Sequence, residues 1–181
     1  MQRAITYFET PGKENTDDTL HLAKECLESE HIRRVILAST TGSTARKAME
    51  LFKDTDVELI VIPHQYGFDK PENKFDRDLI PELEEAGHRV FWSTMLFHTD
   101  GFYGNGAPSA MANILRCFCQ GMKVCFEMAF MATDGGCVED GEEGIVLACT
   151  GRGSDTAIRA TAATPQNMGK FNVHESPCMS E

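Results

Sequence analysis

Short, unbroken apolar runs alternate along the chain with segments whose apolar residues recur at helical spacing. The runs at 35–38, 57–63 and 144–150 have the composition of strands that are covered on both faces of a sheet. Strands that alternate with helices are joined by right-handed crossovers, which places helices on both sides of a parallel sheet. The sequence therefore predicts an α/β fold, and its length predicts a single domain over residues 1–181.

Two more strands complete the predicted sheet. One lies at 89–95, and the other, at 157–163, follows 144–150 without an intervening helix and should therefore run antiparallel to it. The spacing of apolar side chains predicts helices at 16–29, 43–53, 75–86, 109–118 and 122–133. Residues 4–8 fit a short strand or an extended arm, 98–108 fit a long loop, and the tail after residue 164 is weakly patterned.

The formal net charge of −11 argues against nucleic acid and anionic membranes as partners, because both repel an acidic surface. No apolar run approaches the ~18 residues that a membrane span requires. Cysteine occurs 7 times without a secretory signal, so we expect a soluble cytoplasmic protein with reduced thiols. The composition is compatible with a homo-oligomer and does not determine the oligomeric state.

The cysteines do not form a recognisable metal site. Cys117 and Cys119 are close together, but no second pair completes a set of metal ligands, so we expect no metal. These two thiols are expected to be small buried side chains near a helix start. The same expectation applies to Cys26, Cys125, Cys137 and Cys149. Cys178 is expected to be a plain tail residue.

The apolar run at 35–38 leads into small polar residues and then into a helix. The polar residues are Ser39, Thr40, Thr41, Gly42, Ser43 and Thr44. A helix that starts at the end of a strand directs free backbone N–H groups and the positive end of its dipole toward the loop. We therefore predict that this loop holds a phosphate. Arg46, one turn into the helix, either reaches back to the ligand or stands in solvent.

A second loop of similar kind follows the run at 144–150. It consists of Thr150, Gly151, Arg152, Gly153, Ser154 and Asp155. Glycine allows positive φ and close backbone approach, and arginine offers forked donors that suit a phosphate. The spacing excludes a P-loop, and the third glycine of a dinucleotide fingerprint is missing. A tight turn is the alternative for either loop, but two such loops at the carboxyl edge of one sheet favour a binding site.

Two histidines are predicted at the same edge. His64 directly follows the strand beside the phosphate loop, and His98 follows the strand at 89–95. Either side chain is a candidate acid or base near neutral pH, although a lone histidine in a loop is more often only exposed. Trp92 alternates within its strand and is expected in the core, and His88 shows no functional pattern.

Lys123 and Glu127 are four residues apart on an otherwise apolar helix. A narrow solvated stripe is the favoured interpretation, because pairs at this spacing meet on a helix surface. The alternative places Gln120 and Lys123 at the rim of the pocket, since their helix starts at the ligand edge.

Four blocks of the sequence occur in the order found in a known group of proteins. They lie at 7–16, 38–45, 120–124 and 150–157 and read YFETPGKENT, ASTTGSTA, QGMKV and TGRGSDTA. Over residues 7–163 the chain resembles an uncharacterised archaeal and bacterial family that is similar in fold to the C-terminal α/β domain of pyruvate kinase. The resemblance implies a three-layer α/β/α sandwich. Its five-stranded mixed sheet has the order 3-2-1-4-5, with strand 5 antiparallel, so the two loops are neighbours.

The same resemblance implies a ligand. In pyruvate kinase the matching hydroxyl-rich loop holds a phosphate of the sugar-bisphosphate activator, whereas the catalytic barrel of that enzyme has no counterpart in this chain. The stand-alone family resembles a binder of flavin mononucleotide (FMN). This implies an FMN phosphate at 39–44 and a flavin ring among His64, Tyr66, Gly67, Phe68 and the loop at 151–154.

Three functions remain open from the sequence. The first is an FMN-binding protein, with or without oxidoreductase activity. The second is a sensor or binding module for a phosphorylated metabolite, without chemistry. The third is an enzyme acting on such a metabolite, with His64 or His98 as acid or base. The sequence shows no pair of nucleophile and base, so the catalytic residues stay unknown.

Overall fold

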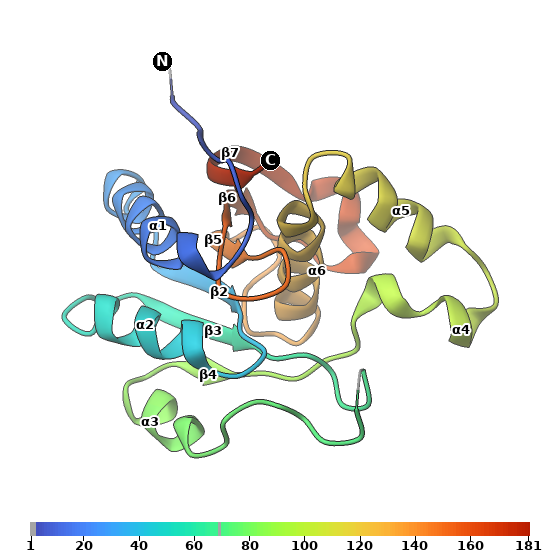
Figure 1. Cartoon of the computed structure of the whole chain (residues 1–181), viewed down its shortest axis with the longest axis horizontal. Coiled ribbons are helices and arrows are strands. Elements are labelled where there is room, and N and C mark those ends of the chain that lie inside the picture. The colour runs from blue at the N-terminus through green and yellow to red at the C-terminus, as the bar shows by residue number, and fades with distance from the viewer. Residues whose placement is uncertain (1–2, 69) are drawn as a thin grey trace.

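A seven-stranded mixed sheet forms the centre of the structure (Figure 1). The computed structural model of the chain describes residues 3–68 and 70–181. Across the sheet the strands follow the order β1-β7-β6-β5-β2-β3-β4. Their bounds are β1 Thr6–Phe8, β2 Arg34–Ala38, β3 Glu58–Ile62, β4 Arg89–Val90, β5 Glu143–Ala148, β6 Thr156–Thr161 and β7 Asn172–Ser180.

The middle of the sheet is parallel. β2 pairs in parallel with β3 on one side and with β5 on the other, and β3 pairs in parallel with β4. β6 is antiparallel to β5, as expected for a strand that returns without a crossover helix. The predicted α/β class is therefore confirmed. The five predicted strands keep their relative order 3-2-1-4-5 as β4-β3-β2-β5-β6 within the larger sheet.

The predicted number of strands is wrong, because β7 and β1 extend the sheet beyond β6. β7 is antiparallel to β6 and parallel to β1. Its inward side chains include Ser176, Cys178 and Ser180, which are small and hide the alternation of large apolar and polar residues that marks a strand. The tail is thus ordered structure, and Cys178 is a fully buried core thiol rather than a plain tail residue.

Helices cover both faces of the sheet. Their bounds are η1 Lys13–Asn15, α1 Thr16–Glu30, α2 Ser43–Phe52, α3 Leu79–Glu85, η2 Leu96–His98, α4 Asp100–Tyr103, α5 Ala107–Arg116, α6 Gln120–Asp134 and η3 Pro165–Lys170. α1, α2 and α3 pack on one face, and α6 packs on the other. α5 and η2 pack against α6, and Figure 1 shows α4 and α5 projecting to the right of the sheet. In the described part of the chain, no helix combines the length and hydropathy of a membrane span.

The stretch at 98–108 is not a long loop, since η2, α4 and the start of α5 occupy it. Gly104 ends α4 in the left-handed conformation, and Pro108 stands in the first turn of α5. Glycine after a helix and proline at a helix start are terminal signals, but they resemble loop residues when helices are this short. Two other predicted bounds are too wide, because β4 ends at Val90 and α3 begins at Leu79.

Of three further side chains, Cys117 departs from its prediction, and Trp92 packs against the core as expected. Cys117 is exposed, because it follows the last residue of α5 on the outer side of α6. His88 is buried, and its Nδ1 accepts a hydrogen bond from the Leu59 backbone N–H at 3.3 Å. Trp92 is half-buried at the edge of the core, where its ring contacts Tyr66 and Phe75.

The start of α6 approaches the sheet too closely for any side chain at Gly121. A Cβ atom added there would lie 2.0 Å from Oγ1 and 2.5 Å from Cβ of Thr156, which is itself fully buried on β6. This contact places the first turn of α6, and the residues that project from it, at the carboxyl edge of β5.

Gly121→Ala is therefore expected to destabilise the protein by ~1–3 kcal/mol, because the buried Thr156 cannot move away and overpacking strains the core. The midpoint of thermal unfolding, followed by circular dichroism, should fall by several degrees. Gly101→Ala is the matched control, since a Cβ atom at this position of α4 meets nothing within 4 Å. Equal melting temperatures for the two variants would contradict the close approach.

Candidate functional site

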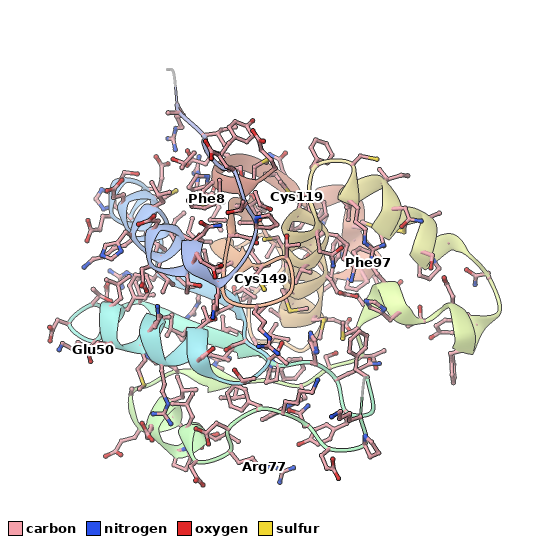
Figure 2. The ribbon with its side chains drawn as sticks, in the orientation of Figure 1. Phe8, Glu50, Arg77, Phe97, Cys119 and Cys149 are labelled. Atoms are coloured by element: carbon pink, nitrogen blue, oxygen red, sulfur yellow. The ribbon has the colours of Figure 1, made fainter. Side chains whose placement is uncertain are left out.

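The carboxyl ends of β2, β3, β4 and β5 meet at one edge of the sheet, because these strands are mutually parallel (Figure 1). Leu37 pairs with Leu147, so the loop after β2 starts beside the loop after β5. Strand order reverses between these two strands, since the chain continues from β2 to β3 on one side and β5 lies on the other. Ligands of α/β proteins bind at such a reversal. Figure 2 shows Cys149, which follows β5, near the centre of the molecule.

The first turn of α2 points unsatisfied donors into this edge. Gly42 precedes the helix with a φ of 92°, and as a glycine it has no side chain to cap the helix. Ser39 Oγ accepts a long 3.4 Å hydrogen bond from the Ala45 N–H. Among the described residues, the N–H groups of Ser43 and Thr44 have no acceptor. The loop therefore has the donor geometry that an anion requires.

The side chains of this loop divide by exposure. Ser39 and Thr44 are buried, and Thr41 and Ser43 are exposed. Thr40 is half-buried, and its Oγ1 lies 3.4 Å from Nε2 of His64. The two exposed hydroxyls contact each other, since Thr41 Oγ1 donates to Ser43 Oγ at 3.3 Å, whereas the buried Ser39 hydroxyl accepts from the first turn of α2.

A group of aromatic rings lies beside the loop at 39–44. Phe68 packs edge-on against His64, with ring centroids 4.8 Å apart, and against His98, at 5.0 Å. Tyr66 contacts Trp92 at 6.0 Å. Gly67 is exposed with a φ of 72°, so it makes the turn that brings Phe68 back toward the two histidines. The structure thus joins His98, which the sequence placed in a separate loop, to the residues that follow β3.

The Gly-Arg-Gly loop has an exposed tip and a buried base. Gly151 and Arg152 are exposed, and both glycines have positive φ as predicted. Gly153 packs against η1, where an added Cβ atom would lie 2.4 Å from Cα of Lys13. Gly153 therefore serves the packing of the N-terminal segment, and the tip at Gly151 and Arg152 is the part that faces solvent.

Ser154 and Asp155 are fully buried, and their oxygens are used within the protein. Asp155 Oδ2 accepts hydrogen bonds from the N–H groups of Gly12 and Thr150, each at 3.0 Å, and Oδ1 accepts from the Thr156 hydroxyl at 3.0 Å. The Ser154 hydroxyl donates to the Ala148 carbonyl at 3.1 Å. These two side chains hold the base of the loop and link it to the N-terminal segment.

The interpretation of Lys123 and Glu127 as a solvated stripe is wrong, because their side chains are 1% and 0% exposed. Lys123 Nζ donates to Glu127 Oε2 at 2.5 Å and lies 2.9 Å from His98 Nε2, and Glu127 Oε1 accepts from the Phe97 N–H at 2.8 Å. This face of α6 is covered by η2, a segment that was predicted to be part of a loop. Figure 2 shows Phe97 beside α6, on its α5 side.

The two histidines are both held toward the neutral form. Burial, followed by the charge of Lys74, lowers the pKa of His64 below its ordinary value. Burial, followed by the charge of Lys123, lowers the pKa of His98. Both imidazoles are therefore neutral at physiological pH.

Arg46 does not reach back to the loop at 39–44. Its guanidinium pairs with Asp76 at 2.9 Å and with Glu82 at 3.2 Å, on the side of α3. Arg46 also lines a surface hollow of about 560 Å³ between α1 and α2, whose walls carry paired charges such as Lys47 and Asp17. This hollow is separate from the loops at the carboxyl edge.

No family model matches the chain. Among solved structures, the chain is similar to pyruvate kinase of Cryptosporidium parvum. The structure in complex with ADP matches at 15% identity and a TM-score of 0.41, over 83% of this chain and 24% of that chain. Two others match at 15% and 16% identity, with TM-scores of 0.40 and 0.38, over 80% and 73% of this chain and 22% and 20% of theirs.

The chain spans less than a quarter of the length of these proteins. A similarity of this level carries no argument about ligand or activity.

Asp155→Ala is expected to lower the free energy of unfolding by roughly 3–5 kcal/mol, because two backbone N–H groups and one hydroxyl lose their acceptor in a buried place. Urea denaturation measures this loss. Hydrogen exchange should accelerate at the amides of Gly12 and Thr150 in the same variant. Asp18→Ala, in the exposed first turn of α1, is the control and should cost less than ~1 kcal/mol. Slow exchange at both amides in Asp155→Ala would contradict the role of this carboxylate.

Proposed function

We propose that this protein binds a phosphorylated ligand with the phosphate at the start of α2, and that the ligand is FMN. The observation that carries the proposal is the first turn of α2, in which the N–H groups of Ser43 and Thr44 have no acceptor among the described residues. Phosphate oxygens supply those acceptors, and the helix dipole adds to the attraction. In a chain with a net charge of −11, an anion depends on such a local set of donors.

The surroundings of the loop fit the remainder of FMN. A flavin ring needs an apolar wall with polar groups at its border, and Tyr66, Phe68 and His64 offer both beside Thr40. Arg152 adds a cation at the exposed tip of the neighbouring loop. Bound FMN supplies one-electron and two-electron redox chemistry. The preference for FMN over other phosphorylated ligands rests on the four sequence blocks that resemble an FMN-binding family.

Two other functions use the same loop. A non-catalytic sensor for a phosphorylated metabolite needs only the phosphate site and the neighbouring rings. An enzyme acting on such a metabolite also needs an acid or base. The distance of 3.4 Å between His64 Nε2 and Thr40 Oγ1 favours this candidate, because it places an imidazole next to the phosphate loop.

The ligand content of the purified protein tests the FMN assignment. The protein is expected to be yellow, with flavin absorbance bands, and denaturation is expected to release FMN that mass spectrometry identifies. A colourless protein whose melting temperature FMN does not raise would contradict the assignment. An increase in melting temperature with sugar phosphates alone would favour the sensor or the enzyme, and an assay of turnover separates those two.

Ser43→Glu tests the place of the phosphate. A carboxylate in the first turn favours the helix, so the fold is retained, but it repels a phosphate at the same N–H groups. We expect FMN to bind at least ~10-fold more weakly, about 1.4 kcal/mol, while riboflavin, which lacks the phosphate, binds as before. Gln166→Glu is the control, because it adds the same charge at an exposed position of η3. Equal weakening of FMN and riboflavin would place the phosphate elsewhere.

A further inference from the structure

A fully buried ion pair interrupts the apolar core beneath the site. Lys123 and Glu127 lie on α6 among Met122, Met128 and Met131, at 2.5 Å from one another. Replacing such a pair with apolar side chains of similar size is often neutral or stabilising, since burial of two charges costs much of what their attraction returns. Stability of the fold therefore does not account for these two residues.

The pair has one further partner, His98. Lys123 Nζ lies 2.9 Å from His98 Nε2. An ammonium group has donors and no acceptor. Burial lowers the pKa of Lys123, and the Glu127 carboxylate, which accepts a hydrogen bond from Nζ at 2.5 Å, opposes that shift and favours the ammonium form. Nε2 of His98 must therefore accept, which puts the single ring proton on Nδ1. Among the described residues, Nδ1 has no hydrogen-bond partner, and the side chain of His98 is exposed.

The charged and titratable groups that face His98 come from four elements. They are Lys123 and Glu127 on α6, Arg116 on α5, Asp100 on α4 and His64 after β3. Lys123 makes the direct contact with the ring nitrogen, and the packing of Phe68 against both histidines joins this cluster to the loop at Thr40. The free N–H of His98 is thus at the same edge as the first turn of α2.

We propose that Lys123 and Glu127 are positioning residues that hold His98 as the neutral Nδ1–H tautomer, and that this N–H donates to a carbonyl oxygen of the phosphorylated ligand. The donor role rests on the proposed function, because the phosphate at α2 brings the ligand to this edge. In FMN the acceptor is a carbonyl of the flavin ring. A neutral imidazole donates there without adding a charge, and its hydrogen bond strengthens if the acceptor oxygen becomes more negative.

The tautomer is tested in the ligand-free protein. Long-range ¹H–¹⁵N spectra of the protein labelled at its 6 histidines distinguish Nδ1–H from Nε2–H, and His98→Gln assigns the signals. The wild type is expected to show His98 as Nδ1–H alone. The Lys123→Met, Glu127→Met double variant removes both charges at similar volume, keeps the fold, and should give His98 a mixture of tautomers and a higher pKa. Lys47→Met with Asp17→Asn removes an exposed pair and should leave His98 unchanged.

An Nε2–H signal in the wild type, or the same tautomer and titration in the Lys123 and Glu127 double variant, would overturn the positioning role. A variant that exchanges the two charges, Lys123→Glu with Glu127→Lys, checks that the effect depends on the placement of the ammonium group. The Nδ1–H preference should be lost there as well, because a carboxylate near Nε2 favours a proton on that nitrogen.

The donor role is tested by adding FMN and, separately, inorganic phosphate. FMN is expected to shift the Nδ1 resonance of His98 and the amides of Ser43 and Thr44, whereas inorganic phosphate should shift the two amides alone. FMN that moves the amides and leaves His98 unchanged would overturn the donor role and leave the proposed function in place. If FMN shifts neither the His98 resonance nor the two amides, both the donor role and the proposed function are overturned. The tautomer of the free protein would still decide the role of Lys123 and Glu127.

Discussion

The parallel pairing of β2 with β5 is the constraint on which the site depends. These two strands are distant in the sequence, and their register, Val35 to Ile145 and Leu37 to Leu147, leaves their ends level. Both strands are buried on both faces, so neither can shift by one residue without exposing its apolar side chains. The loops that follow them therefore start side by side, and the reversal of strand order opens the edge between them.

Around that edge, some residues stabilise the loops and others keep donors that a ligand can reach. Asp155 and Ser154 form hydrogen bonds with backbone groups at the base of the loop at 150–155, and Gly153 packs on η1. The start of α2 and the tip at Arg152 keep their donors free or exposed. A rigid base with an open tip is a suitable arrangement for binding, because the ligand does not need to order the loop on arrival.

Much of the fold can be predicted from the sequence, because its signal is local. Apolar runs such as 59–62 and the small loop after Ala38 specify buried strands and a strand-to-helix turn by themselves. β7 escapes prediction because Ser176, Cys178 and Ser180 are too small and polar to reveal which face is buried. Lys123 and Glu127 escape it for a different reason: their burial is decided by η2, a single turn that carries His98 and has no periodicity of its own.

The sequence likewise predicts where the two candidate loops lie, but it does not predict which of their residues are accessible and which are buried. Glycine and hydroxyl residues mark both loops in the sequence, yet only tertiary contacts separate an accessible Ser43 from a buried Ser39, or Gly151 in open space from Gly153 against Lys13. Apolar neighbours such as Met122 and Cys125 are the one local signal of burial for Lys123 and Glu127, but the spacing of the pair by itself fits a solvated stripe.

The sheet also sets an order of assembly. β1 pairs only with β7 among the described strands, and β7 is the last strand of the chain. During synthesis on the ribosome, Thr6–Phe8 leaves the exit tunnel long before Asn172–Ser180 and has no partner in the sheet until that strand emerges. Contacts across such a separation form late and slowly. The parallel centre at β2, β3 and β4 can form while later residues are still being synthesised, and the edge made by β7 and β1 completes the sheet only after β7 has emerged.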